Sequence, residues 1–138
     1  MIDGHKFGSF VVNGREYLGD IKIIGSKVRL WDRKKHEVDI DDVKDILKAE
    51  PEVIIVGTGN SGYLQLEKSL RDYLLAKRIK LFIGVNSEAI AKYNEAVNQR
   101  KNICAIFHST CWTLDNVIYL TYFNFFMDLK DRICEYLE

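Results

Sequence analysis

The fold is decided by residues 53–62, which read Val-Ile-Ile-Val-Gly-Thr-Gly-Asn-Ser-Gly. The first four residues are apolar and β-branched, which is typical of a parallel strand that is buried on both faces. Pro51, two residues upstream, indicates that any preceding helix has already ended. The stretch therefore predicts a central strand that runs directly into a glycine loop.

The glycines of this loop follow the spacing Gly-x-Gly-x-x-Gly, at which backbone can approach a phosphate and point free N–H groups at it. We expect a solvent-reachable cleft in which at least two amides of residues 57–59 have no protein acceptor. The alternative is structural, because glycines also permit a tight turn and close helix packing. The candidate ligand-binding residues are Gly57, Thr58, Gly59, Asn60 and Gly62.

Two familiar nucleotide sites do not fit the sequence. A dinucleotide site needs an acidic residue about 20 positions on, at the end of the next strand. The strand at residues 80–83 is instead followed by Gly-Val-Asn-Ser, with no carboxylate before Glu88. A Walker loop would place Lys-Ser or Lys-Thr after Gly62, and neither pair is present. We predict no cofactor.

The composition suits one compact domain, with 138 residues, 47% hydrophobic content and a single proline. Twenty basic and twenty acidic residues cancel, so a nucleic-acid or membrane partner would need a local basic patch. No basic and then apolar leader opens the sequence, which predicts no signal peptide. The three cysteines lack Cys-x-x-Cys spacing, which favours reduced thiols and a cytoplasmic location.

The pattern along the chain predicts an α/β domain with a mixed sheet. Hairpins are expected around Asn13-Gly14 and Gly25-Ser26, helices at about 39–48, 66–76 and from 87, and further strands at 80–83 and 103–107. Strands that alternate with helices from residue 39 onward imply right-handed crossovers and a parallel βαβ core. Ligands bind outside the carboxyl ends of such strands, so the loops that follow them should share one rim.

Two reactive side chains follow the last predicted strand. His108 and Cys111 are candidate catalytic residues, because an imidazole can lower a thiol pKa and generate a nucleophile. The sequence identifies no acidic residue to orient the imidazole, and bonding of loop backbone by His108 is the competing interpretation. His-x-x-Cys supplies two ligands where zinc needs three or four, so we predict no metal. The sequence leaves open whether the chain is an enzyme.

Two other segments are unusual in composition. Residues 27–36 are rich in Lys and Arg around Trp31, which suits single-stranded nucleic acid but also a protected edge strand. Because the whole chain is neutral, we expect no nucleic-acid partner. Residues 117–127, Val-Ile-Tyr-Leu-Thr-Tyr-Phe-Asn-Phe-Phe-Met, are too few to span a bilayer, which takes about 20. We expect them to pack on the domain or in a self-contact.

Four short pieces of the sequence, taken in order, resemble a small family of domains of unknown function. They are Trp31-x-Arg33-x-x-His36, residues 51–59 (Pro-Glu-Val-Ile-Ile-Val-Gly-Thr-Gly), Ala89-x-x-x-Tyr93-Asn94 and His108-x-Thr110-Cys111. The family includes the mitochondrial assembly factor three of respiratory complex I and an adipogenesis-associated domain protein. The resemblance covers about residues 5–111.

The resemblance implies a single three-layer domain of β/β/α type, with helices on one side of a mixed sheet and a β layer on the other. It carries over no reaction, and it implies assembly and protein partnership. Residues 1–111 are then the family-like domain and 112–138 a C-terminal extension. The favoured function is a non-enzymatic binding or assembly module with a protein partner or self-association. The alternative is a small-anion-binding protein or enzyme that uses loop 57–62 with His108 or Cys111.

Overall fold

The structure, a computed structural model, describes residues 1–6, 8–32, 35–60 and 62–109. Its elements are β1 (Ile2–Lys6), β2 (Ser9–Val12), β3 (Arg15–Leu18), β4 (Ile21–Ile24), β5 (Lys27–Leu30), β6 (Glu37–Val38), the 3-10 helix η1 (Asp41–Val43), α1 (Lys44–Lys48), β7 (Val53–Gly57), β8 (Gln65–Leu66), α2 (Lys68–Ala76), β9 (Lys80–Gly84), α3 (Asn86–Asn98) and β10 (Ile103–Phe107).

Five strands form the central sheet, in the order β5-β4-β10-β7-β9. β7 pairs in parallel with both β10 and β9, whereas β4 pairs antiparallel with β10 and with β5. A three-stranded antiparallel sheet, β1-β2-β3, and a short parallel pair, β6-β8, complete the described strands. The predicted α/β architecture, a mixed sheet with a parallel core and N-terminal antiparallel hairpins, is confirmed.

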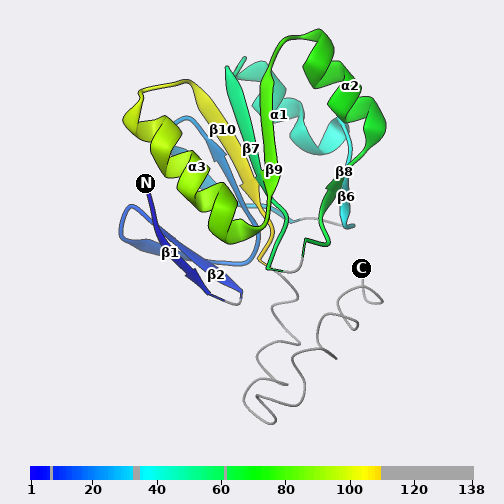
Figure 1. The fold of residues 1–138 in the computed structure, drawn as a ribbon. Helices are drawn as coiled ribbons and strands as arrows, with labels where there is room; N and C mark the ends of the chain where they lie inside the picture. Colours follow the sequence, from blue (N-terminus) through cyan, green and yellow to red (C-terminus); the bar gives the residue numbers. More distant parts are fainter. Residues whose placement is uncertain (7, 33–34, 61, 110–138) are drawn as a thin grey trace.

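The central sheet separates two apolar cores, because alternate residues of each strand face opposite sides. On one side Ile55 and Phe107 pack with Phe10 of β2 and Tyr93 of α3. On the other side Ile54, Ile106 and Cys104 pack against α1 and α2. Figure 1 shows α3 and the β1–β2 layer together on one side and α1 and α2 on the other. Helices therefore cover both faces of the sheet, and α3 shares its face with the β layer.

The predicted hairpins form for the reasons read from the sequence. Asn13 and Gly14 both have positive φ, 50° and 81°, and Val12 pairs with Arg15 across them. That is the two-residue turn that Asn-Gly favours, because its twist matches the twist of the strands. Gly25, with φ 61°, turns the second hairpin. β1 was not predicted, since its Ile-Asp-Gly-His-Lys sequence has little apolar periodicity.

Helix α2 begins later than its apolar spacing predicts and ends in a left-handed residue. Residues 65–66 pair with β6 as a strand, so the helix starts at Lys68. At the other end Arg78 has φ 59°, and the next N–H, of Ile79, donates to the Leu74 carbonyl at 3.0 Å. Glycine usually occupies this position. Arg100, with φ 57°, follows α3 in the same way.

Two predictions concern residues that the structure does not describe. Cys111 and the extension 112–138, with its apolar stretch 117–127, lie outside the described residues, and their roles stay predictions. Within the described part of the chain, every helix is too short or too polar to cross a membrane.

We predict that Gly57→Ala lowers the free energy of unfolding by about 1–3 kcal/mol. A methyl group there would lie 2.4 Å from Cδ1 of Phe107 and 2.6 Å from Oδ1 of Asn86, so one of them must shift. Gly4→Ala is the matched control, because nothing lies within 4 Å of its added methyl. Urea denaturation measures both. Equal stability of the two variants would contradict the close contact at Gly57.

Candidate functional site

The carboxyl ends of β7, β9 and β10 meet at one rim, as the sequence predicts. The Thr58 N–H donates to the Gly84 carbonyl at 2.9 Å, and the His108 N–H donates to the Gly57 carbonyl at 2.9 Å. The three loops that follow these strands are therefore joined by backbone hydrogen bonds, although they are far apart in the sequence.

Asn86, the first residue of α3, holds this rim together. Its Oδ1 accepts the Gly59 N–H at 3.1 Å, its Nδ2 donates to the His108 carbonyl at 2.8 Å, and its own N–H donates to the Gly59 carbonyl at 3.1 Å. The side chain is buried. Sequence reasoning assigned Asn86 no role. The available signal was its position, directly after a strand end and before a helix.

The expectation of at least two free amides in residues 57–59 is wrong. Thr58 and Gly59 donate their N–H groups to Gly84 and Asn86, and Gly57 belongs to the strand ladder with β10. Gly57 is required because Phe107 and Asn86 occupy the space of a side chain. The structural interpretation of the glycine spacing therefore accounts for Gly57. Ligand binding by this loop stays a prediction, with Asn60 exposed and Gly62 in the left-handed region at φ 77°.

A buried carboxylate, Asp20, orients His108. Its oxygens lie 3.2 and 3.3 Å from Nδ1 of His108, and Oδ1 also accepts the N–H and the hydroxyl of Ser109, both at 2.7 Å. The antiparallel register that pairs Ile21 with Phe107 places Asp20 beside His108. The acidic partner that the sequence did not reveal is thus Asp20, 88 residues away.

The other ring nitrogen of His108 is enclosed. His108 is 1% exposed, and its Nε2 has no hydrogen-bond partner among the residues that the structure describes. The centroid of the His36 ring lies 5.1 Å from that of the His108 ring, at an interplanar angle of 78°. The centroid of the Tyr63 ring lies 6.2 Å from that of His36. The arrangement orients an imidazole as in an acid–base pair, but with its free nitrogen turned away from solvent.

The remaining reactive or charged candidates do not converge on this rim. Cys104 lies inside β10, and burial raises the pKa of its thiol. Arg29 forms an ion pair with Asp45, and Lys35 forms one with Asp39 at 3.2 Å, so part of the basic run is neutralised within the domain. Among the described residues, no three His, Cys, Asp or Glu side chains lie close enough to hold a metal.

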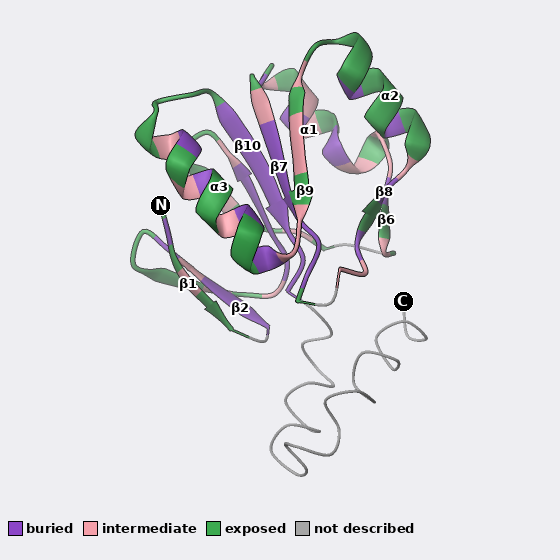
Figure 2. Ribbon diagram, in the orientation of Figure 1, coloured by how far each residue is buried: buried purple, intermediate pink, exposed green. Residues whose placement is uncertain are grey.

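A second surface lies at the edge of the sheet, along β9. The Lys80 N–H donates to the Glu52 carbonyl, and the Gly84 carbonyl accepts the Thr58 N–H. Alternate residues of a parallel strand hydrogen-bond the same neighbouring strand. The backbone N–H and C=O groups of Phe82 therefore also face β7. Leu81 and Ile83 therefore point their N–H and C=O groups outward. β9 is coloured intermediate and exposed in Figure 2, unlike the buried strands β7 and β10.

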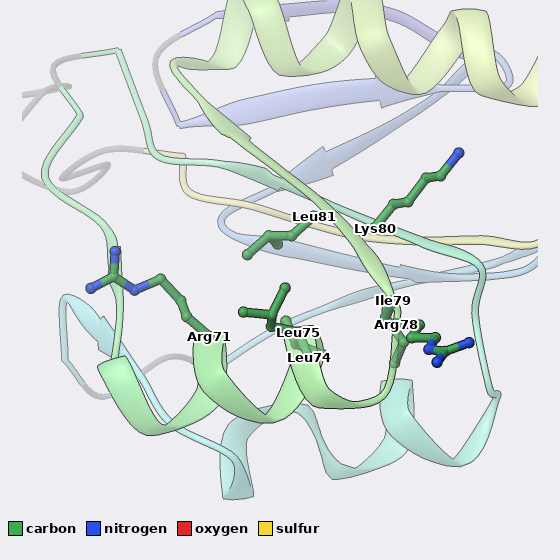
Figure 3. Close-up of a pocket in the computed structure, with 7 residues that line it drawn as sticks. All are labelled: Arg71, Leu74, Leu75, Arg78, Ile79, Lys80 and Leu81. Atoms are coloured by element: carbon green, nitrogen blue, oxygen red, sulfur yellow. The ribbon is translucent and has the colours of Figure 1, made fainter.

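A groove of about 470 Å³ runs between this edge and α2. Its apolar residues are Leu74, Leu75, Ile79 and Leu81, and its basic residues are Arg71, Arg78 and Lys80. Figure 3 shows Arg71 and Arg78 on opposite sides of the leucines. Within the described part of the chain, none of the three cations has a carboxylate partner. Leu75 is 79% exposed and Ile83 40%.

Comparison with known protein families gives one match, to a family described as a protein of unknown function (DUF498/DUF598), over residues 2–108. The chain belongs to this family. The match contains every described strand and helix, together with Asp20, Asn86 and His108. Residues 109–138 lie outside it.

Solved structures share the family fold. The conserved hypothetical protein PH1505 from Pyrococcus horikoshii OT3 is 27% identical, with a TM-score of 0.70, over 80% of this chain and 99% of that one. The protein MT938 is 28% identical, with a TM-score of 0.68, over 80% and 98%. The Rpa2829 protein from Rhodopseudomonas palustris is 23% identical, with a TM-score of 0.64, over 78% and 82%. These proteins resemble the chain in fold, and their names state no activity.

We predict that Asp20→Ala lowers the free energy of unfolding by about 2–4 kcal/mol, because the hydrogen bonds that Asp20 accepts from the buried Ser109 N–H and hydroxyl, and its contact with His108 Nδ1, are lost. Asp41→Ala is the control. Asp41 pairs with Lys44 at the surface, where an ion pair contributes about 0–1 kcal/mol. Thermal or urea unfolding measures both. A loss at Asp20 no larger than at Asp41 would contradict the buried network.

Proposed function

We propose that this domain is a non-enzymatic binding module that holds a protein partner along the open edge of β9. The observation that carries the proposal is the row of outward N–H and C=O groups at Leu81 and Ile83. An open edge is a template for another strand, and proteins that do not use one usually blunt it with charges, bulges or a covering element. In β9 Lys80 is charged, but Ile83 is exposed and apolar.

The neighbouring side chains support the same proposal. Leu75 of α2 is 79% exposed, beside a groove with an apolar floor and a basic rim. A large apolar side chain next to unpaired backbone groups is the arrangement that strand-adding peptide sites use, in which backbone gives affinity and side chains give specificity. An assembly role, as implied by the resemblance to complex I assembly factor three, would require such a surface.

The rim at the carboxyl ends supports catalysis less well. The amides of Thr58 and Gly59 are occupied by the protein itself, and His108 is 1% exposed. A general base must come within hydrogen-bond reach of its substrate. In the described structure the polar groups of this rim hold three loops together.

The proposal predicts position-specific crosslinking to a partner. A photo-crosslinking amino acid at Leu75 should trap a discrete protein in the cells that make this chain, because that side chain would lie at the interface. The same group at Glu16, which is exposed on β3, should trap nothing in common with it. No adduct from Leu75, or identical adducts from both positions, would contradict the proposed surface.

A second candidate is a ligand or acid–base site at His108, together with residues 57–62 and Cys111. It is favoured by one observation, that Asp20 orients the imidazole while Nε2 is buried and has no partner in the described part of the chain. A ligand that forms a hydrogen bond with Nε2 would satisfy it. Native mass spectrometry should then show a mass above that of the chain, and His108→Phe should remove it. A bare mass for the gently purified wild type would exclude a tightly held ligand.

A further inference from the structure

The groove and the edge of β9 together define the chemistry of the partner. We infer that the occupant is an acidic segment of another protein, bound in extended conformation as a sixth strand beside β9, with alternate apolar and acidic side chains. The inference rests on the proposed binding function and adds the class of partner. It is carried by two independent properties of the surface, its backbone and its charge.

The backbone sets the conformation of the occupant. Leu81 and Ile83 each present one donor and one acceptor outward, and only an extended chain can bond both residues in succession. Side chains of an added strand alternate between the two faces of the sheet. On the α2 face they would meet Leu75 and Leu81, and on the α3 face Lys80 and Lys92, whose Nζ lies 5.8 Å from the Phe82 ring.

The charge sets the sign of the occupant. Arg71, Arg78 and Lys80 have no carboxylate partner among the described residues. Arg71 and Arg78 flank the leucines of the groove, whereas the Lys80 side chain points across β9 to the α3 face. Asp72, the one carboxylate within α2, is already paired with Lys68 at 3.0 Å. Uncompensated cations beside an apolar floor attract carboxylates and repel a basic segment. In an alternating segment the apolar side chains would meet the leucines on the α2 face, and the acidic ones would meet Lys80 and Lys92 on the α3 face. Acidic residues at the two ends of the segment would meet Arg71 and Arg78, which lie on opposite sides of the leucines.

A second copy of this chain fits the surface less well. A two-fold contact uses the same patch on both partners. Pairing β9 with itself would therefore bring Arg71 and Arg78 of both copies together on the α2 face, and Lys80 of both copies together on the α3 face. Like charges placed together oppose association. The chain has zero net charge, so this repulsion is local to the edge of β9.

Selection of peptides on the folded domain tests the class of partner without knowledge of its identity. A random peptide display library should yield sequences in which acidic and apolar residues alternate. A selected peptide, made synthetically with a fluorescent label, should bind with an affinity that falls as salt rises. Enrichment of basic or proline-rich sequences, or no enrichment, would overturn the inference.

The charge contribution has a matched pair of variants. Arg78→Gly and Arg100→Gly each replace an arginine that follows a helix in the left-handed conformation, which glycine adopts without strain. Both variants should therefore fold at least as stably as the wild type. Arg78→Gly should weaken peptide binding about five-fold, and Arg100→Gly should leave it unchanged. Equal effects would show that Arg78 does not contact the peptide.

The backbone contribution has its own pair. Ile83→Pro removes an outward N–H without breaking the bonds to β7, which edge strands tolerate, whereas Ile83→Ala shortens the side chain and keeps the N–H. The proline variant should abolish binding, and the alanine variant should weaken it less. Binding unaffected by proline would overturn strand addition. A wild-type dimer in light scattering that the proline variant converts to monomer would instead assign the edge to a second copy.

These outcomes separate the two proposals. A partner trapped at Leu75 whose crosslinked segment is basic or helical would refute the acidic, extended occupant and leave the binding function standing. The absence of any adduct at Leu75 would remove the binding function itself.

Discussion

The structure depends on the pairing of β10 with β4 on one side and β7 on the other. All five residues of β10 are buried, and both of its edges are bonded. These two registers fix the remaining geometry. The antiparallel register with β4 brings Asp20 to His108, and the parallel register with β7 brings Gly57 to the same end. The order of strands then leaves β9 at the edge of the sheet, and no other described strand pairs with its outer side.

The same pairing explains why the rim at the carboxyl ends is tightly held. Three loops converge there, and their polar groups bond one another through Asn86, Asp20 and the Thr58 hydroxyl, which donates to the Gly84 carbonyl at 3.1 Å. Buried polar groups need such partners, because an unsatisfied one costs about 1–3 kcal/mol. In this family member the glycine-rich turn therefore serves the fold at Gly57, where a side chain would collide with Phe107.

Local patterns predicted most of the elements of the fold. Asn13-Gly14 specified a hairpin, and the β-branched run before Gly57 specified a buried parallel strand. The pairs that matter at the rim could not be predicted, since Asp20 and His108 meet only through the register of β4 and β10. At least two free amides were expected in residues 57–59, because sequence spacing does not show which acceptors folding will supply.

The groove was missed for a related reason. Arg71, Leu74 and Leu75 are spaced as one side of α2, and Arg78 follows its end, but apolar spacing in a helix ordinarily marks the side that faces the core, as it does for Leu70 and Leu74. Neither the exposure of Leu75 nor the unpaired state of the cations is visible in a neutral composition. A local basic patch was named as the requirement for an anionic partner, and this groove is such a patch within the described residues.

The central claim is that β9 has an open edge, and amide hydrogen exchange of the folded, unliganded protein tests it most directly. Resolved residue by residue by NMR, the amides of Leu81 and Ile83 should exchange rapidly, because their N–H groups face outward. The amide of Phe82 between them faces β7 and should exchange far more slowly. Strong protection at Leu81 and Ile83, equal to that of Phe82, would mean that the edge is already covered and would contradict this account.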